Sequence, residues 1–326
     1  MIQINDSKSH QVIADGNCQF SPLLKLKWND IHDKTNIFRY RIVNLQERLV
    51  NEKLLIFHKV VYFLKLNPNR QSKRRYPEEI NDICQPFDEK RFNFTKVSKE
   101  EILFTFKEND EGKLLYIMKI NMSLPISKYH SLLCPSIYKC LPQVITKESL
   151  KLVINIMLLA QDRTLRIGFN SLCGFASVNH LHYHLFIEKQ NLPVENVFDD
   201  SYPVPGFCFE VYHGSENIDE IFILLNYLLR KSIAHNIMVT RGDPIEASCD
   251  VFRVVVWPRK STSGAKLLLA FNVAVLCYQE ATWDCEALII VTSQHGLRLY
   301  VVFYIYYCLV ILIVQDPRPP LTLRNF

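Results

Sequence analysis

Three histidines at every second position, His180, His182 and His184, are the feature of this chain that most constrains its structure. Apolar residues alternate with them, in a stretch rich in residues that favour strands. Successive side chains of a strand point to opposite faces, so the pattern predicts three imidazoles on one face, with Leu181 and Tyr183 packed behind them. A strand with a purely structural role rarely brings three imidazoles together, and we therefore expect a functional site here.

Two chemistries use such a row of imidazoles. A catalytic zinc site needs three protein ligands and an open position, and histidines at i and i+2 of a strand can supply two of the ligands. The carboxylates that would orient such ligands are not evident near the row. In covalent nucleotide transfer, one neutral imidazole attacks a phosphorus atom while its neighbours orient it and balance the phosphate charge. A cluster of core or surface histidines is the third interpretation, and the residue types favour nucleotide transfer.

The segment before the histidines offers hydrogen-bond donors for a phosphate group. Residues 168–171 end a predicted strand, and residues 174–177 form a loop of small residues. Backbone amides, the Asn170 side chain and the Ser177 hydroxyl can contact phosphate oxygens that gain charge in a transition state. Asn170, Gly174 and Ser177 are therefore candidate substrate-binding residues.

The same residues resemble the histidine-triad superfamily, in which the middle histidine forms a covalent nucleotidyl intermediate. Residues 168–182, with the sequence GFNSLCGFASVNHLH, more closely resemble its GDP-D-glucose phosphorylase branch, the animal relatives of plant GDP-L-galactose phosphorylases. Further segments within residues 85–96, 141–149, 233–242 and 257–274 agree in order along the chain. The resemblance therefore runs from about Ser21 to Val275.

This resemblance implies a nucleotidyltransferase that converts GDP-D-glucose and inorganic phosphate to GDP and glucose 1-phosphate. It implies that His182 is the nucleophile, and that His180 and His184 hold its tautomer and help to balance charge. Asn170 and Ser177 would bind the phosphoryl oxygens. No metal and no cofactor are required by such a mechanism.

The resemblance also marks Arg241 as a candidate phosphate or ribose contact by its position, although a surface arginine is the commoner explanation. The expected partners are GDP-D-glucose and phosphate, with a second copy of the chain as a possible homodimer partner. Nucleic acid is not expected as a partner, and membrane binding is not favoured.

Three other functions stay open on the sequence. A histidine-triad hydrolase would let water resolve the intermediate and release GMP, and a metalloprotein would use the same histidines. A nucleotide-binding protein without catalysis is the third. Cys173 favours it, because the family usually has glycine there and glycine tolerates backbone angles that other residues avoid.

The order of the predicted elements indicates an α+β fold with a histidine-triad-like antiparallel sheet and packed helices. Apolar residues at i, i+3, i+4, i+7 and i+8 predict a helix over residues 150–158, which Thr146 and Glu148 favour at its start. The other predicted elements are a helix and an edge element within residues 21–55, hairpin strands 102–106 and 114–120, and strand 164–170. A second and weaker succession of elements, without a histidine row, comprises strand 206–212, helix 218–229, and strands 237–240 and 251–257. We therefore expect two fused triad-like lobes of which one is catalytic.

These elements give a predicted domain division. Residues 1–20 are an expected N-terminal extension, and residues 21–275 form the phosphorylase-like domain. Within it we expect a catalytic lobe at about 85–190 and a second lobe at about 205–275. Residues 276–326 form an atypical hydrophobic tail, which we expect to come from an alternative or mispredicted exon end.

Composition supports an intracellular enzyme. The net charge of +5 is scattered along 326 residues, so a solvated surface explains it better than an anion-binding patch. Ten cysteines without a secretory signal predict reduced thiols and a cytoplasmic location. The uncharged interval 299–314 is short for a membrane helix, and its tyrosines and β-branched residues favour a strand. A membrane anchor is the weaker alternative for this interval.

Overall fold

The computed structural model describes most of the chain between residues 20 and 259, with shorter segments on either side. The described residues are 2–5, 11–13, 20–38, 46–55, 58–66, 80–108, 114–120, 129–160, 162–174, 176–189, 192, 195, 206–211, 218–242, 251–259, 273–275, 289–291, 301–302 and 310–311.

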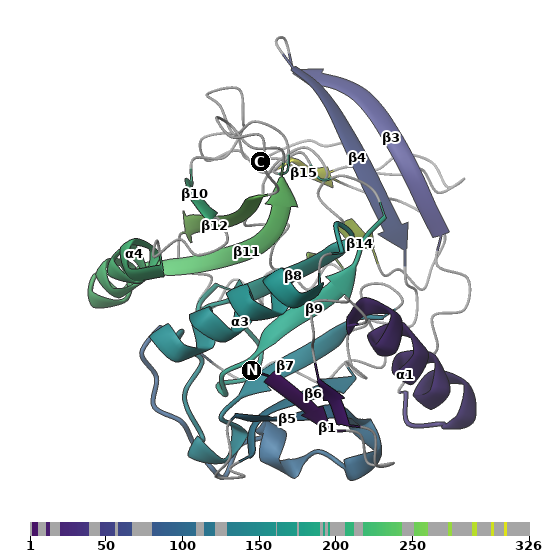
Figure 1. The fold of residues 1–326 in the computed structure, drawn as a ribbon. Helices are drawn as coiled ribbons and strands as arrows, with labels where there is room; N and C mark the ends of the chain where they lie inside the picture. Colours follow the sequence, from purple (N-terminus) through teal and green to yellow (C-terminus); the bar gives the residue numbers. More distant parts are fainter. Residues whose placement is uncertain are drawn as a thin grey trace.

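Ten strands of these residues form one antiparallel sheet, which runs through the centre of the molecule (Figure 1). In spatial order they are β10 (Phe207–Val211), β12 (Val251–Arg259), β11 (Ala234–Gly242), β8 (Leu165–Asn170), β9 (Tyr183–Ile187), β7 (Ser131–Pro135), β6 (Leu114–Ile120), β5 (Ile102–Glu108), β1 (Ile2–Asn5) and β2 (Gln11–Ile13). The predicted hairpin is confirmed as β5 and β6. β1 lies within the expected N-terminal extension, yet it pairs with β5 and belongs to this sheet.

Helices α1 (Phe20–Lys34), α3 (Lys147–Ala160) and α4 (Ile218–Arg230) pack on one face of the sheet. In Figure 1, α3 lies over β8 and β9, and α4 lies at the β10 end of the sheet. The main hydrophobic core fills the space between these helices and alternate residues of the strands, among them Ile167, Leu185 and Val254. Burial of such side chains contributes roughly 1.5–3 kcal/mol each, so this face is where the fold gains most of its stability.

The start of α3 follows the predicted capping. The Thr146 hydroxyl accepts a hydrogen bond from the Ser149 backbone N–H at 3.1 Å, and the Ser149 hydroxyl accepts one from the Thr146 N–H at 3.0 Å. These bonds satisfy backbone donors that a helix start leaves unpaired. Ser149 also bonds the Tyr183 hydroxyl at 2.8 Å, so the helix start is fixed to the first residue of β9.

The order of the central strands repeats. β7, α3, β8 and β9 follow one another in the chain, and β10, α4, β11 and β12 repeat this succession. In the sheet the two sets read β8-β9-β7 and β11-β12-β10, with β8 and β11 paired where the sets meet. The second set agrees with the strand, helix and two strands that the sequence predicted within residues 206–257.

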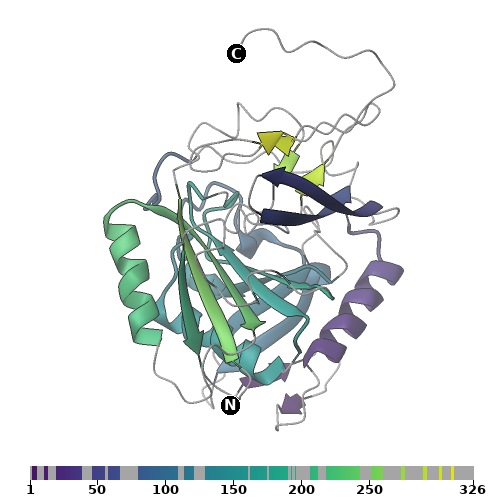
Figure 2. The same ribbon diagram turned by 90° about the horizontal axis from the view of Figure 1, so that it is seen from above.

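A smaller sheet consists of β13 (Val273–Val275), β14 (Ile289–Val291), β4 (His58–Leu66) and β3 (Gln46–Leu55), and Figure 2 shows β3 and β4 apart from the helices. Of the apolar interval 299–314, the described residues are β15 (Val301–Val302) and β16 (Val310–Ile311), which pair antiparallel. They are strands, as the composition of the interval favoured. None of the helices in the described ranges has the length and apolar character needed to cross a membrane.

Candidate active site

The histidine row lies at the start of β9, on the face of the sheet opposite the helices. Only His184 belongs to the strand, because β9 begins at Tyr183. The predicted strand was therefore too long, although its alternation holds: Leu181, Tyr183 and Leu185 lie in the core under the helices. On the other face the ring centroids of His182 and His184 are 5.2 Å apart.

Phe94 joins His180 to this pair. It lies in the short 3-10 helix η1 (Phe94–Lys96), and its ring centroid is 5.6 Å from that of His180 and 4.9 Å from that of His182. The three predicted imidazoles thus belong to one cluster. His180, His182 and His184 are all buried, so little water surrounds the rings.

The hydrogen bonds of His182 define its tautomer. Its Nδ1 lies 2.8 Å from the backbone carbonyl oxygen of His180 and 2.9 Å from Oε1 of Gln143. Both partners only accept hydrogen bonds, so Nδ1 carries the proton. Nε2 of the neutral ring then holds a lone pair, which is the form that can attack an electrophile.

His180 has the opposite tautomer. Its Nδ1 accepts a hydrogen bond from the Phe94 backbone N–H at 3.0 Å, so the proton of the neutral ring is on Nε2. Nε2 is buried and has no hydrogen-bond partner among the described residues. Burial lowers the pKa of His180 to about 4, and the backbone of Ile137 acts weakly in the opposite direction. At neutral pH this ring is therefore uncharged and presents a buried N–H donor.

A fourth histidine extends the row. Nε2 of His130 lies 3.0 Å from Nδ1 of His184, and both rings are buried. The backbone carbonyl of His130 accepts a hydrogen bond from the Trp28 indole at 3.3 Å, which connects it to α1. In a pair of neutral imidazoles one nitrogen donates and the other accepts, so the tautomer of His184 depends on that of His130.

The candidate phosphate-binding residues lie where β8 ends. Oδ1 of Asn170 accepts a hydrogen bond from Nδ2 of Asn236 at 2.9 Å, and the same Nδ2 donates to the Gly174 carbonyl at 2.9 Å. The amide of Asn170 is thereby oriented, and its Nδ2 makes no hydrogen bond to the residues that the structure describes. Ser177 is half-buried, and its hydroxyl likewise has no such bond. Both groups keep donors for a ligand.

The loop between these two residues is tight. A side chain added at Gly174 would place its Cβ 2.7 Å from Oγ of Ser171, so glycine is needed for close packing. Cys173 has a φ of 57°, in the left-handed region that favours glycine. The sequence suggested that Cys173, where the family usually has glycine, could affect the loop. This has a structural basis, because the backbone at Cys173 takes an angle that glycine tolerates best.

Arg241 is not brought to the histidines. It follows Ile237 and Val239 on the helix-covered face of β11, where its Nη2 donates to the Met157 carbonyl of α3 at 3.0 Å. Its guanidinium lies 4.4 Å from the centroid of the Phe252 ring. These contacts fix α3 to the sheet, and the geometry does not support the predicted contact of Arg241 with phosphate or ribose.

Sequence reasoning missed the groups that hold the histidines. Gln143, His130 and Asn236 contact the predicted residues through their side chains, but they come from distant parts of the chain. Gln143 lay in a segment that resembles the family, and this was the one signal that could have identified it. Within the described residues, no group of three or more histidine, cysteine, aspartate or glutamate side chains is arranged to hold a metal ion.

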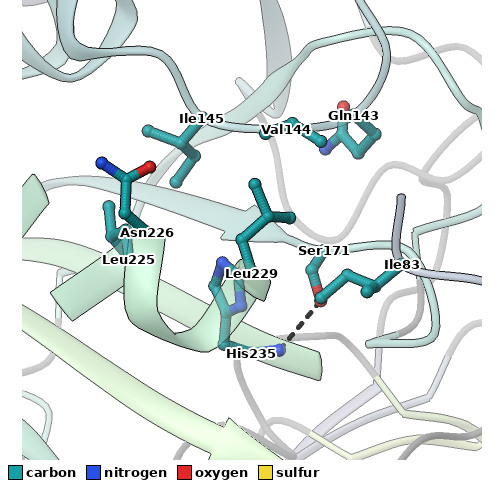
Figure 3. A pocket seen from close by; sticks show the side chains of 9 residues that line it. All are labelled: Ile83, Gln143, Val144, Ile145, Ser171, Leu225, Asn226, Leu229 and His235. Atoms are coloured by element: carbon teal, nitrogen blue, oxygen red, sulfur yellow. Dashed lines mark hydrogen bonds between the residues drawn. The ribbon is translucent and has the colours of Figure 1, made fainter. Parts of the chain in front are cut away.

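A small pocket lies beside α4, and Gln143 is one of the residues that line it (Figure 3). Its lining residues are Ile83, Gln143, Val144, Ile145, Ser171, Leu225, Asn226, Leu229 and His235. The His235 backbone N–H donates to Oγ of Ser171 at 2.8 Å, and Nδ1 of the ring lies 3.1 Å from the Ile233 carbonyl. Burial lowers the pKa of His235 to about 4, so its ring is neutral.

The fold and the imidazole cluster together define a histidine-triad-like protein. The solved structure of yeast Ap4A phosphorylase Apa2 is similar, with a TM-score of 0.52 and 14% sequence identity over 83% of this chain and 87% of that chain. This likeness concerns the fold.

Sequence comparison gives the family. The family model described as "GDPGP1-like, N-terminal domain" matches residues 19–186. GDP-D-glucose phosphorylase 1 of Danio rerio is 36% identical over 281 residues, which cover 80% of this chain and 78% of that protein. GDP-L-galactose phosphorylase 2 of Arabidopsis thaliana is 32% identical over 186 residues, or 52% of this chain and 41% of that protein. The chain belongs to the GDPGP1-like family, which confirms the resemblance read from residues 168–182.

Proposed function

We propose that this protein is a GDP-D-glucose phosphorylase, which converts GDP-D-glucose and inorganic phosphate to GDP and glucose 1-phosphate. The observation that carries the proposal is the pair of acceptors on Nδ1 of His182, which places the lone pair of the neutral ring on Nε2. The substrate follows from the relatives, one of which is named GDP-D-glucose phosphorylase 1. The expected nucleotidyltransferase chemistry needs a nucleophile of this kind.

In the first step, Nε2 of His182 attacks the α-phosphorus of GDP-D-glucose. An N–P bond forms, and the bond from the α-phosphorus to the bridging oxygen breaks, with its electron pair leaving on glucose 1-phosphate. In the second step, an oxygen of inorganic phosphate attacks the same phosphorus, breaks the N–P bond and releases GDP. Two in-line displacements thus replace one, and the enzyme returns to its starting form.

The surrounding donors would stabilise the charge that gathers on the phosphoryl oxygens. Nδ2 of Asn170 and the Ser177 hydroxyl are the available side-chain donors at the end of β8 and in the following loop. Nε2–H of His180 is a further buried donor near the nucleophile, and His184 contacts the ring of His182 directly. In this scheme no step uses a metal or a cofactor.

We also propose the predicted division into two lobes, a catalytic lobe at about 85–190 and a second lobe at about 205–275. The repeated strand order supports it. On the face of the sheet where β9 presents His184 opposite Leu132 of β7, β12 presents Arg253 opposite Glu210 of β10. Arg253 contacts the Glu210 carboxylate at 3.3 Å, so the second lobe has an ion pair on the face that carries the imidazoles in the first lobe. The cytoplasmic location and the homodimer stay predictions from sequence.

The dependence of the product on phosphate tests this function. The purified chain is incubated with GDP-D-glucose, with and without inorganic phosphate, and the nucleotide product is identified by chromatography. We expect GDP to form only when phosphate is present. Formation of GMP in its absence, at a rate that phosphate does not change, would instead establish a hydrolase.

A further inference from the structure

Gln143 joins the nucleophile to the phosphate-binding strand. It lies between the 3-10 helix η3 (Ile137–Lys139) and α3, and its side chain is buried. The loop around it is fixed to the histidine segment from both sides: the Leu181 N–H donates to the Leu141 carbonyl at 2.9 Å, and the Gln143 N–H donates to Oδ1 of Asn179 at 3.0 Å. The position of the Gln143 side chain is therefore tightly determined.

The side-chain amide of Gln143 uses all of its hydrogen-bonding capacity. Oε1 accepts from the backbone N–H and from Nδ1 of His182, both at 2.9 Å. Nε2 donates to the backbone carbonyls of Asn170 and His182, at 2.9 and 3.0 Å. An amide has two acceptor sites and two donor hydrogens, and here each one is matched.

Backbone groups decide which way this amide points. The backbone N–H of His182 can only donate, and the carbonyls of Asn170 and His182 can only accept. A flipped amide would place its NH₂ against a donor and its oxygen against two acceptors, all buried, at a cost of roughly 1–3 kcal/mol for each unsatisfied group. Oε1 must therefore face Nδ1 of His182.

The His180 carbonyl also accepts from Nδ1 of His182, at 2.8 Å. From this geometry we infer that Gln143 is a positioning residue that, together with this carbonyl, holds His182 as the Nδ1–H tautomer and ties its ring to Asn170. The inference rests on the proposed function for its catalytic consequence. Once Nε2 has bonded to phosphorus, the ring is cationic, and a hydrogen bond from its Nδ1–H to Oε1 is charge-assisted and strengthened. Gln143 would thus favour both the reactive tautomer and the covalent intermediate.

Replacement of Gln143 by glutamate separates this role from a structural one. Gln143→Glu keeps both acceptor contacts, loses the two donors and adds a negative charge beside His182. That charge favours the protonated imidazole, so guanylylation should be lost at a higher pH on acidification than in the wild type. The other ionisable groups in contact with this row are His180, His184 and, through His184, His130. We expect a rate about 10- to 100-fold lower at neutral pH, because the nucleophile is protonated or misplaced.

Asn93→Asp is the matched control. Oδ1 of Asn93 accepts from the Thr95 N–H at 3.1 Å, and its Nδ2 donates to the carbonyls of Glu89 and Arg91 at 3.3 Å. The aspartate also keeps its acceptor contacts and loses two donors to backbone carbonyls, but no bond joins this side chain to His182. It should lower the melting temperature, but guanylylation should be lost at the same pH as in the wild type.

Nitrogen NMR of histidine-labelled protein gives a readout that needs no turnover. The His182 signals are assigned by their loss in His182→Asn. We expect the Nδ1–H tautomer in the wild type and more imidazolium in Gln143→Glu. In Gln143→Met we expect a partial shift toward the Nε2–H tautomer, because the His180 carbonyl still accepts from Nδ1. Unchanged His182 signals in both folded variants, or equal changes in Asn93→Asp, would overturn the inference. If the wild type forms no guanylyl adduct but the Gln143 variants still change the His182 signals, the proposed function fails while the positioning role stands.

Discussion

Nε2 of His130 lies 3.0 Å from Nδ1 of His184, although 54 positions separate the two residues. This contact links the residue before β7 to the histidine row and orients the ring of His184, which lies next to that of His182. His130→Phe should lower the rate of guanylylation about 10- to 100-fold, because small displacements of a reacting group carry penalties of this size. Rapid-quench measurement of the adduct would determine the rate.

His130→Gln provides the comparison for that prediction. Its side-chain amide can donate a hydrogen bond to Nδ1 of His184, so it should retain more activity than the phenylalanine variant. The Trp28 indole contacts the backbone of His130, and this bond is present in both variants. Equal losses in the two variants would show that His130 acts through packing and not through its hydrogen bond.

Replacement of Cys173 tests the backbone strain of the loop between Asn170 and Ser177. Its φ of 57° penalises any residue with a Cβ by about 1–2 kcal/mol. Both Cys173→Ala and Cys173→Gly lose the buried sulfur, but only glycine removes the penalty. The glycine variant should therefore be more stable than the alanine variant by about 1 kcal/mol in urea unfolding. An alanine variant of equal or greater stability would show that the strain is absent.

Two buried neutral histidines make the folded state sensitive to acid. The pKa values of His180 and His235 are lowered to about 4, from an ordinary value of 6.5. Between these pH values the two histidines are protonated in the unfolded chain but neutral in the folded state. The free energy of unfolding therefore falls as the pH drops from about 6.5 to about 4. Below pH 4 these two groups cause no further loss. Each ring accounts for about 3 kcal/mol of this loss.

His235→Phe should remove the contribution of His235 to this loss of stability in acid. His235 does not belong to the histidine row, so the variant leaves that row unchanged. The variant should lose about half as much stability as the wild type from these two rings when urea unfolding is compared at about pH 7 and about pH 4.5. A pH dependence identical to that of the wild type would mean that His235 is protonated in the folded state.

A buried ion pair lies on the face of the sheet that carries the histidine row, and it leads to a separate prediction. Nη2 of Arg166 contacts Oε2 of Glu195 at 2.8 Å, Thr240 donates to the same carboxylate, and the Glu195 backbone carbonyl accepts from Arg253 at 2.9 Å. Glu195→Gln should cost about 3 kcal/mol, because the buried guanidinium of Arg166 loses its carboxylate partner.

Replacement of both partners should cost less than the single change. Arg166→Met combined with Glu195→Met removes the two charges together, so stability should recover relative to Glu195→Gln in chemical unfolding. A double variant that is less stable than the single one would show that the ion pair itself contributes strongly to folding.

The sequence predicted the elements of the fold well where one period dominated. The helical period before β8 predicted α3, and the weaker repeat of the element order after β9 predicted α4, β11 and β12. The start of β9 was wrong for a physical reason. Before Tyr183 the N–H groups of Leu181 and His182 bond to the Leu141 carbonyl and to the side chain of Gln143 instead of a neighbouring strand.

The site was predicted in part. The histidines and Asn170 lie close in sequence, so local spacing was enough to predict them as candidates, whereas His130 and Gln143 reach them only through the fold. The face on which Arg241 lies could have been deduced, because Ile237 and Val239 share its parity in β11 and both are core residues. The prediction that Arg241 contacts phosphate or ribose instead relied on the position of Arg241 in the family resemblance.

The most direct test of the central claim is the intact mass of the wild type and of His182→Asn after each is mixed with GDP-D-glucose in the absence of phosphate. The wild type should gain the mass of one guanylyl group and lose it as GDP when phosphate is added, while His182→Asn should gain nothing. An unmodified wild type that still binds GDP-D-glucose, or an adduct that persists in His182→Asn, would contradict the assignment of His182 as the nucleophile.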